Sequence, residues 1–265
     1  IGGGGGNASQ VVSKFSGPGA KFNIGIGGSV GPDGTGGMGG TGGDVTVENL
    51  ANTDGNAGQI VTLGANAHGI RNLLCLSGVH QQFGDHPTAK GVFDIDSIGL
   101  VHLINNLNHG IDVGEKRIGD PTSFFTGVGV DPNSVNAENE IHRLQLKKEA
   151  GAEYVITQPV FDVDSLEDFL EQADLGSLAL IAGIWPLVSL RNAEFMKNEV
   201  PGVYVPDEVI KRLRGADKQK REGTNICIEM IQQVREIEGI SGVHVMAYRQ
   251  EELIDEIIDR SGVLA

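Results

Sequence analysis

The sequence predicts an α/β fold of the (β/α)8 barrel type, in which five βα units are recognisable behind a glycine-rich leading segment. From residue 70 onward, short apolar runs alternate with amphipathic stretches, and this alternation is typical of parallel βαβ units. Before that point, residues 1–70 carry 22 of the 40 glycines but only six charged residues. The break predicts two parts, a glycine-rich segment at 1–69 and a barrel domain at 70–265.

Five apolar runs are nearly continuous in β-branched and aliphatic residues, as expected of strands buried on both faces of a parallel sheet. They read RNLLCLS, SFFTGVGV, EYVITQPV, LALIAGIW and GVHVMAY. Helices are predicted at the amphipathic stretches 96–107, 137–150, 165–173, 190–198, 207–213, 223–238 and 251–261. No GxGxxG motif follows a strand, which disfavours an open dinucleotide-binding sheet. A barrel is the better interpretation, although it needs eight units and five are visible.

The leading segment is predicted to form short strands or coil. Runs such as IGGGGGN and GTGGMGGTGGD resist helix, because glycine loses the most backbone entropy on folding. Only residues 44–50 and 58–64 cluster β-forming residues, and no helical period is evident. These two candidate strands either stack as a solenoid, dock against the open edges of the five-stranded sheet, or belong to a flexible leader.

Charge and cysteine content narrow the function classes. A net charge of −15 argues against a nucleic-acid partner, whose binding depends on basic side chains. No apolar run approaches the ~20 residues that span a bilayer, and no signal peptide is evident. Cys75 and Cys227 lie in no metal-binding spacing, which predicts buried reduced thiols in a cytoplasmic protein and no metal site.

In barrels of this type, ligands bind at the carboxyl ends of the strands. The predicted strands end at Ser77-Gly78, in the loop from Gly129 to Asp131, at Gln158 and at Trp185. Small residues at these ends let a flat ligand approach the backbone, and the Gln158 amide can both donate and accept hydrogen bonds.

Several ordered motifs of residues 70–265 resemble methylenetetrahydrofolate reductase of the bacterial type, covering the C-terminal two thirds of its barrel. The matching text is GIRNLLCLSG, GDHPTAKGVFDIDS, RLQLKKEAGAEYVITQPVFD, AGIWPLVS and GTNICIEMIQQ. The resemblance implies FAD at the barrel mouth, NADH or NADPH as reductant, and reduction of 5,10-methylenetetrahydrofolate to 5-methyltetrahydrofolate in one-carbon metabolism. It also implies a cytoplasmic enzyme, either as a homo-oligomer or in a complex with other proteins of that pathway.

The resemblance also implies site residues. Gln158 matches the glutamine that binds the pterin of the folate, and Leu190 matches the apolar position that stacks on it. Lys147 and Glu140 match positions at the phosphate and ribitol side of the flavin. The full set of implied cofactor-binding positions is Leu76, Ser77, Gly78, Asp96, Ser97, Gly129, Val130, Asp131, Glu140 and Lys147.

Two departures from the family pattern leave the catalytic residues unknown. Val79 stands where the family carries an aspartate near the flavin, so a charge and two acceptor oxygens are lost. Residues 1–69 also do not resemble the first three units of the family, which contain the proposed general acid. Loss of that acid would remove a factor of roughly 10²–10⁴ in rate.

Residues 1–69 instead resemble the glycine-rich repeats of bacterial autotransporter adhesins, in IGGGGGN, GGTGGDVTVENL and GANAHGI. Two alternatives to a working reductase follow from this likeness. One is a catalytically impaired reductase-like fragment fused to an adhesin-like leader. The other is a fragment of a secreted glycine-rich adhesin.

Overall fold

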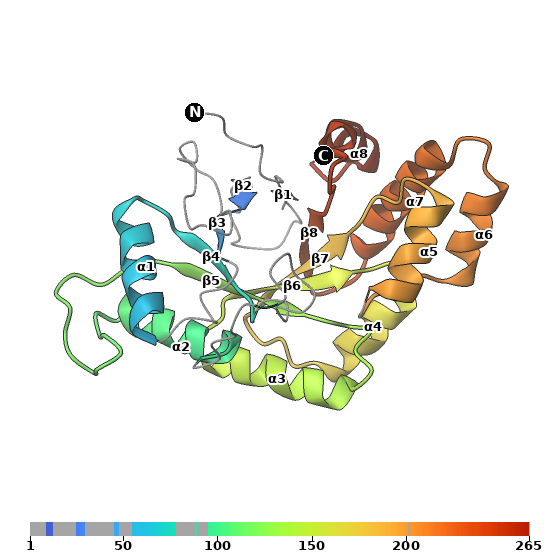
Figure 1. The fold of residues 1–265 in the computed structure, drawn as a ribbon. Coiled ribbons are helices and arrows are strands. Elements are labelled where there is room, and N and C mark those ends of the chain that lie inside the picture. Colours follow the sequence, from blue (N-terminus) through green and yellow to red (C-terminus); the bar gives the residue numbers. More distant parts are fainter. Residues whose placement is uncertain are drawn as a thin grey trace. The chain divides into compact units, whose positions relative to one another are not determined.

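The computed structural model describes residues 9–12, 25–29, 45–47, 55–77, 88, 95–200 and 202–264. Figure 1 shows their elements along the chain. The strands are β1 (Ser9–Val12), β2 (Gly25–Ser29), β3 (Val45–Val47), β4 (Asn72–Cys75), β5 (Phe125–Val130), β6 (Tyr154–Pro159), β7 (Ala179–Ile184) and β8 (Ile240–Val245). The α-helices are α1 (Gly55–Ala67), α2 (Ser97–Asn108), α3 (Ala137–Glu149), α4 (Val163–Gln172), α5 (Leu190–Glu199), α6 (Asp207–Gly215), α7 (Gln219–Val234) and α8 (Ile254–Ser261).

All five predicted strands of the barrel domain are confirmed as β4 to β8, and a helix lies at each predicted amphipathic stretch. The hydrogen-bonded strand order follows the chain from β1 to β8, which is the order of a closed barrel. Strands β5, β6, β7 and β8 are buried at almost every position. This continuous burial explains why the sequences of these strands consist almost entirely of apolar residues.

The chain divides into two compact units. The first consists of Ile1–Gly6, Gly27–Gly129 and Leu144–Tyr154, and its strands pair in parallel. Val45 of β3 lies opposite Leu73 of β4, and Leu73 lies opposite Thr126 of β5. The Tyr154 hydroxyl donates to the Leu73 carbonyl at 3.1 Å, and its ring stacks on Phe125.

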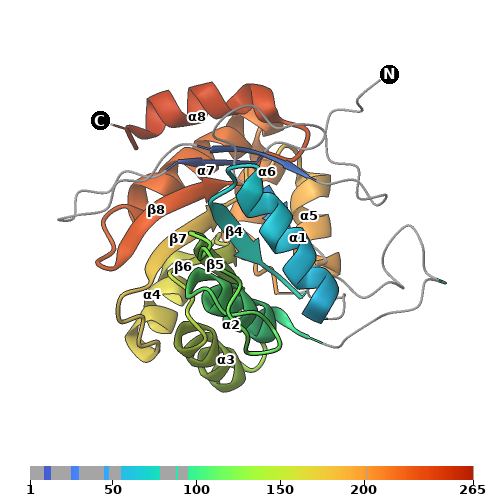
Figure 2. The same ribbon diagram turned by 90° about the vertical axis from the view of Figure 1, so that its left-hand side faces the viewer.

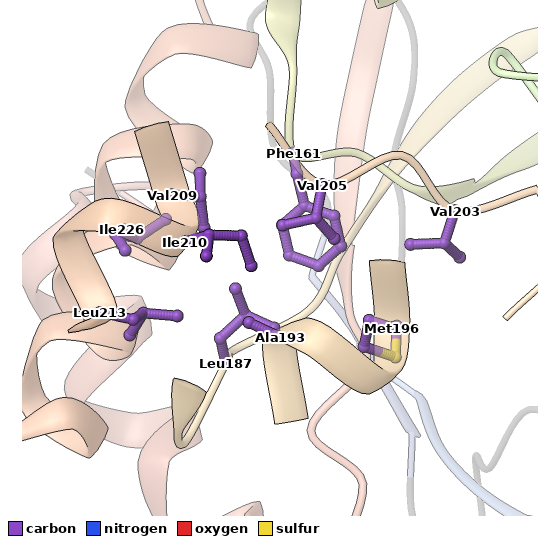
Figure 3. Packing of buried hydrophobic residues seen from close by; sticks show 10 residues of the cluster. All are labelled: Phe161, Leu187, Ala193, Met196, Val203, Val205, Val209, Ile210, Leu213 and Ile226. Atoms are coloured by element: carbon purple, nitrogen blue, oxygen red, sulfur yellow. The ribbon is translucent and has the colours of Figure 1, made fainter. Parts of the chain in front are cut away.

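The second unit consists of Asn7–Ile26, Val130–Arg143 and Val155–Ala265. Strands β7 and β8 pair in parallel, with Gly183 opposite His244, and Figure 2 shows them side by side. Helices α5, α6 and α7 pack against one another in this unit (Figure 1). Their apolar faces enclose a core of ten buried residues, among them Phe161, Leu187 and Leu213 (Figure 3).

One prediction for the leading segment is confirmed and another is wrong. Residues 45–47 form β3, within the predicted strand at 44–50, whereas residues 58–64 lie in α1. The apolar cluster there is too short for its period to separate strand from helix. Helix α1 packs on α2 and buries Thr62, so tertiary contact overrides the local preference for strand.

Both outer members of the five-strand set have further partners. Strand β3 pairs in parallel with β4, and β1 pairs antiparallel with β8. The antiparallel β1 departs from the all-parallel arrangement of a regular (β/α)8 barrel. Pairing at both edges covers backbone groups that would otherwise invite aggregation.

The two cysteines are free and buried, as predicted. Burial raises the pKa of each thiol to about 12. Neither thiol therefore forms the reactive thiolate at neutral pH in the folded protein.

Candidate functional site

A buried lysine lies beside the carboxyl end of β5. Lys147, in the last turn of α3, is 7% exposed, and its Nζ donates to the Gly129 carbonyl at 2.7 Å. A solvated lysine that only complements the helix dipole would not be buried in this way. A buried ammonium needs polar partners, and the Gly129 carbonyl is one of them.

Gly129 also brings Leu76 into the same group. A Cβ added at Gly129 would lie 3.1 Å from Leu76 Cδ2, so the two residues are in close contact just beyond β4 and at the end of β5. The Ser77 hydroxyl lies nearby in the chain and accepts the Ser97 N–H at 3.2 Å. The first unit thus connects five of the predicted cofactor-binding residues through three direct contacts and the Leu76-Ser77 peptide bond. They are Lys147, Gly129, Leu76, Ser77 and Ser97.

Asp96 precedes α2 and caps it. Its Oδ1 accepts the Gly99 N–H at 3.0 Å, which satisfies one of the free N–H groups at the helix start. Because a carboxylate already occupies this helix terminus, the position disfavours phosphate and suits hydroxyl donors. Asp96 and Ser97 are predicted to lie at the nucleotide end of a flavin. The ribose at that end carries hydroxyl groups, which are donors of this kind.

In the second unit, Asp131 and Glu140 lie together. The Asp131 N–H donates to Glu140 Oε1 at 3.1 Å, and Asp131 Oδ1 accepts the Asn133 N–H at 3.0 Å. Burial raises the pKa of the Asp131 carboxyl, the Asn133 hydrogen bond lowers it and the charge of Glu140 raises it further. The net rise means that Asp131 keeps a proton to higher pH than an ordinary aspartate, and a protonated carboxyl can donate a hydrogen bond.

Gly202 faces the other oxygen of this carboxyl. A Cβ at Gly202 would meet Asp131 Oδ2, and the backbone there has φ +77°, a conformation that favours glycine.

Val130, another predicted cofactor-binding position, is 2% exposed, so its side chain belongs to the core.

Gln158 is exposed at the carboxyl end of β6, between buried neighbours. Thr157 before it is buried, and its Oγ1 accepts the Gly183 N–H and donates to the Gln158 carbonyl, both at 2.8 Å. The exposed amide therefore projects from a backbone that hydrogen bonds hold on both sides. Such an amide can pair with a donor and acceptor edge of a planar heterocycle.

Leu190 begins α5 and is half-buried. It packs, together with Trp185, against the core of Figure 3, while its N–H donates to Gln219 Oε1 at 2.9 Å. Part of its apolar surface remains accessible, as the predicted stacking role requires.

Two features of the second unit were not predicted from the sequence, although Trp185 itself was expected at a strand end. Trp185 stacks on Tyr248 with ring centroids 6.4 Å apart, and the Arg249 guanidinium lies over the Tyr248 ring at 5.2 Å. The sequence signal for this group is Tyr248 followed by Arg249, an aromatic and a cationic residue just after an apolar strand. The other feature is His244, whose two ring nitrogens are buried and lack a hydrogen-bond partner among the described residues.

Two of the predicted positions, Gly78 and Val79, lie outside the described residues, as do most residues of the leading segment. Across the described part of the chain, no cluster of three or more His, Cys, Asp or Glu side chains could hold a metal ion. The described helices include none that is both long and apolar enough to cross a membrane.

Comparison with known proteins identifies relatives over most of the chain. The family model for methylenetetrahydrofolate reductase matches residues 47–262. The 5,10-methylenetetrahydrofolate reductase of Buchnera aphidicola subsp. Schizaphis graminum is 26% identical over 203 residues, which are 74% of this chain and 63% of that protein. The Escherichia coli K12 enzyme of the same name is 25% identical over 203 residues, 74% of this chain and 62% of the relative. The chain thus spans less than two thirds of the length of these relatives.

A solved structure supports the fold. An uncharacterized protein from Clostridium thermocellum, which binds two copies of 5-methyl-5,6,7,8-tetrahydrofolic acid, superposes with a TM-score of 0.52 at 14% identity. The superposition covers 83% of this chain and 71% of the other. The family match begins at residue 47, before the predicted boundary at residues 69 and 70, and includes all five strands from β4 to β8. The chain belongs to the methylenetetrahydrofolate reductase family.

Proposed function

We propose that this protein reduces 5,10-methylenetetrahydrofolate to 5-methyltetrahydrofolate, with FAD as cofactor and NADH or NADPH as reductant. Family membership supports the reaction class. The observation that carries the proposal is the buried amino group of Lys147, held 2.7 Å from the Gly129 carbonyl where β5 ends. A buried cation at a strand end of this fold is suited to an anionic cofactor.

The residues fit a flavin by their chemistry. Gly129 and Leu76 offer an uncharged surface, and Lys147 offers a cation. Asp96 and Ser97 offer groups that accept from hydroxyls, and Asp131 and Glu140 offer carboxyls at the β5 end. We infer that these residues, with Ser77, Gly78 and Val130 as neighbouring backbone, hold FAD.

The folate is assigned to Gln158 and Leu190. The Gln158 amide would donate to and accept from the pterin edge, and Leu190 would cover its apolar face. Bound FAD would supply hydride transfer from the nicotinamide to the methylene carbon of the substrate. The protein's contribution is to bind and orient both molecules and to limit their exposure to water.

A second function, binding without appreciable turnover, is favoured by Val79. Valine in place of the family aspartate removes a carboxylate that supports folate binding, and no general acid has been identified in residues 1–69. On this alternative the protein would bind flavin and folate but reduce the substrate slowly. We infer that either form acts in the cytoplasm, which the nicotinamide reductants and the two free thiols support. Sedimentation of the purified protein would test for a homo-oligomer or a larger complex.

The experiment that tests the FAD assignment compares two adjacent lysines. We expect the wild-type protein to bind FAD with quenching of flavin fluorescence, and Lys147→Met to weaken binding at least about tenfold, because a buried charge-assisted contact is lost. Lys148→Met changes the next residue of the same helix and should bind FAD as the wild type does. Absence of FAD binding by the wild type, or equal losses in the two variants, would contradict the assignment.

A further inference from the structure

A side-chain hydroxyl connects β6 and β7 beside Gln158. The Gly183 carbonyl accepts the Val160 N–H at 2.8 Å. The Gly183 N–H donates to Thr157 Oγ1 at 2.8 Å, so a side chain of β6 bonds directly to the backbone of β7.

The Thr157 hydroxyl bridges the two strands. It donates to the Gln158 carbonyl at 2.8 Å while it accepts from Gly183. One buried oxygen thus connects the Gly183 N–H with the Gln158 carbonyl. Thr157 is 1% exposed, so water does not compete for these bonds and each contributes more than it would at a surface.

Gly183 is matched to this arrangement. A Cβ at Gly183 would lie 2.5 Å from the Thr157 carbonyl oxygen, 2.7 Å from Met246 Cε and 3.2 Å from the Gln158 carbonyl oxygen. No side chain can be accommodated there without moving the backbone of β6, because two of the three nearest atoms are main-chain oxygens. The glycine lets β7 approach the strand end closely, and the hydroxyl sets the separation at Gln158.

We propose that Thr157 is a positioning residue for folate, which sets the backbone of Gln158 through its hydroxyl and so aims the Gln158 amide at the pterin edge. The assignment rests on the proposed function of Gln158. The Thr157 side chain lies in the core and makes no contact with the ligand. Its removal deprives the Gly183 N–H of this acceptor and the Gln158 carbonyl of this donor, which leaves the Gln158 backbone free to shift.

The test measures affinity for 5-methyltetrahydrofolate and for FAD in variants of Thr157. Thr157→Val keeps the shape and deletes the hydroxyl, and should weaken folate binding about tenfold, with FAD affinity changed less than about twofold. Thr157→Ser keeps the hydroxyl and should restore folate binding to near the wild-type value. If Thr157→Val does not fold, Thr157→Ala deletes the same hydroxyl without adding volume.

A double-mutant cycle separates positioning from general damage. In a Gln158→Ala background, Thr157→Val should change folate affinity by less than about twofold, because the threonine acts only through the amide. An equal loss in both backgrounds, or wild-type folate affinity in Thr157→Val, would overturn the assignment of Thr157 alone. Failure of the wild-type protein to bind folate would instead overturn the proposed function, and the assignment of Thr157 with it.

Discussion

Replacement of Gly223 by alanine should destabilise the protein by roughly 2 kcal/mol or more, the largest effect we expect from adding one methyl group. Gly223 lies within α7, and a Cβ there would come within 1.6 Å of the Leu187 carbonyl oxygen. The obstacle is backbone of the α5, α6 and α7 core, where Leu187 is fully buried. Relief therefore requires α7 to move away from that core.

The matched control is Gly64→Ala in α1, where nothing lies within 4 Å of the added Cβ. This change should raise stability by about 0.5–1 kcal/mol, because alanine favours helix over glycine. Urea unfolding followed by circular dichroism measures both variants. A Gly223→Ala protein as stable as the wild type would mean that α7 does not approach the Leu187 carbonyl so closely.

Stability should also fall steeply in mild acid because of His244. Burial lowers the pKa of this imidazole to about 4, whereas in an unfolded chain it is near 6.5. Between these two values the unfolded chain binds a proton that the folded protein does not. The contribution of neutral His244 is therefore fully present above pH 6.5 and is lost as the pH falls toward 4, by roughly 3 kcal/mol in total.

The measurement is the free energy of unfolding as a function of pH, for the wild type and for His244→Phe. We expect the free energy of unfolding of the variant to fall less than that of the wild type between pH 6.5 and pH 4, because the contribution of His244 is absent. This difference should appear whatever the stability of the variant at neutral pH. The exposed His142, replaced by glutamine, is the control and should keep the wild-type profile. An unchanged profile in His244→Phe would show that His244 is not buried as a neutral base.

The barrel strands could be predicted from sequence because each is buried along its length. The run EYVITQPV became β6 (Tyr154–Pro159) and LALIAGIW became β7 (Ala179–Ile184), with ends within a residue or two. A strand that is buried along its whole length has a continuous run of apolar residues, and such a run can be recognised from the local sequence. The fold class and the positions of the strand ends follow from this pattern.

Features that depend on register could not be predicted. The Tyr154 hydroxyl bonds to Leu73, 81 positions away, and a Cβ at Gly127 would clash with the Tyr154 ring. The bridge made by the Thr157 hydroxyl likewise exists only because the Gly183 N–H comes within hydrogen-bond distance of it. His244 was overlooked because a single histidine in GVHVMAY gives no sign of whether its nitrogens find partners.

The candidate site was predicted largely from the family resemblance. Lys147, Gly129 and Leu76 do come together, and Asp131 does meet Glu140, while the roles of these residues in binding stay predictions. Val130 was included only as a neighbour in the sequence, and its burial could not be read from the motif. The adhesin-like character of residues 1–69, and the boundary at residues 69 and 70, stay predictions.

The central claim is that this chain, which spans less than two thirds of its reductase relatives, carries out their reaction. The most direct measurement is anaerobic incubation of the FAD-loaded protein with NADH or NADPH and 5,10-methylenetetrahydrofolate, with the folate products separated by chromatography. We expect 5-methyltetrahydrofolate to form at a rate that scales with protein concentration and that exceeds the rate with free FAD. Product no greater than that of the free-FAD control, from protein shown to bind both ligands, would contradict the claim and leave binding without turnover as its function.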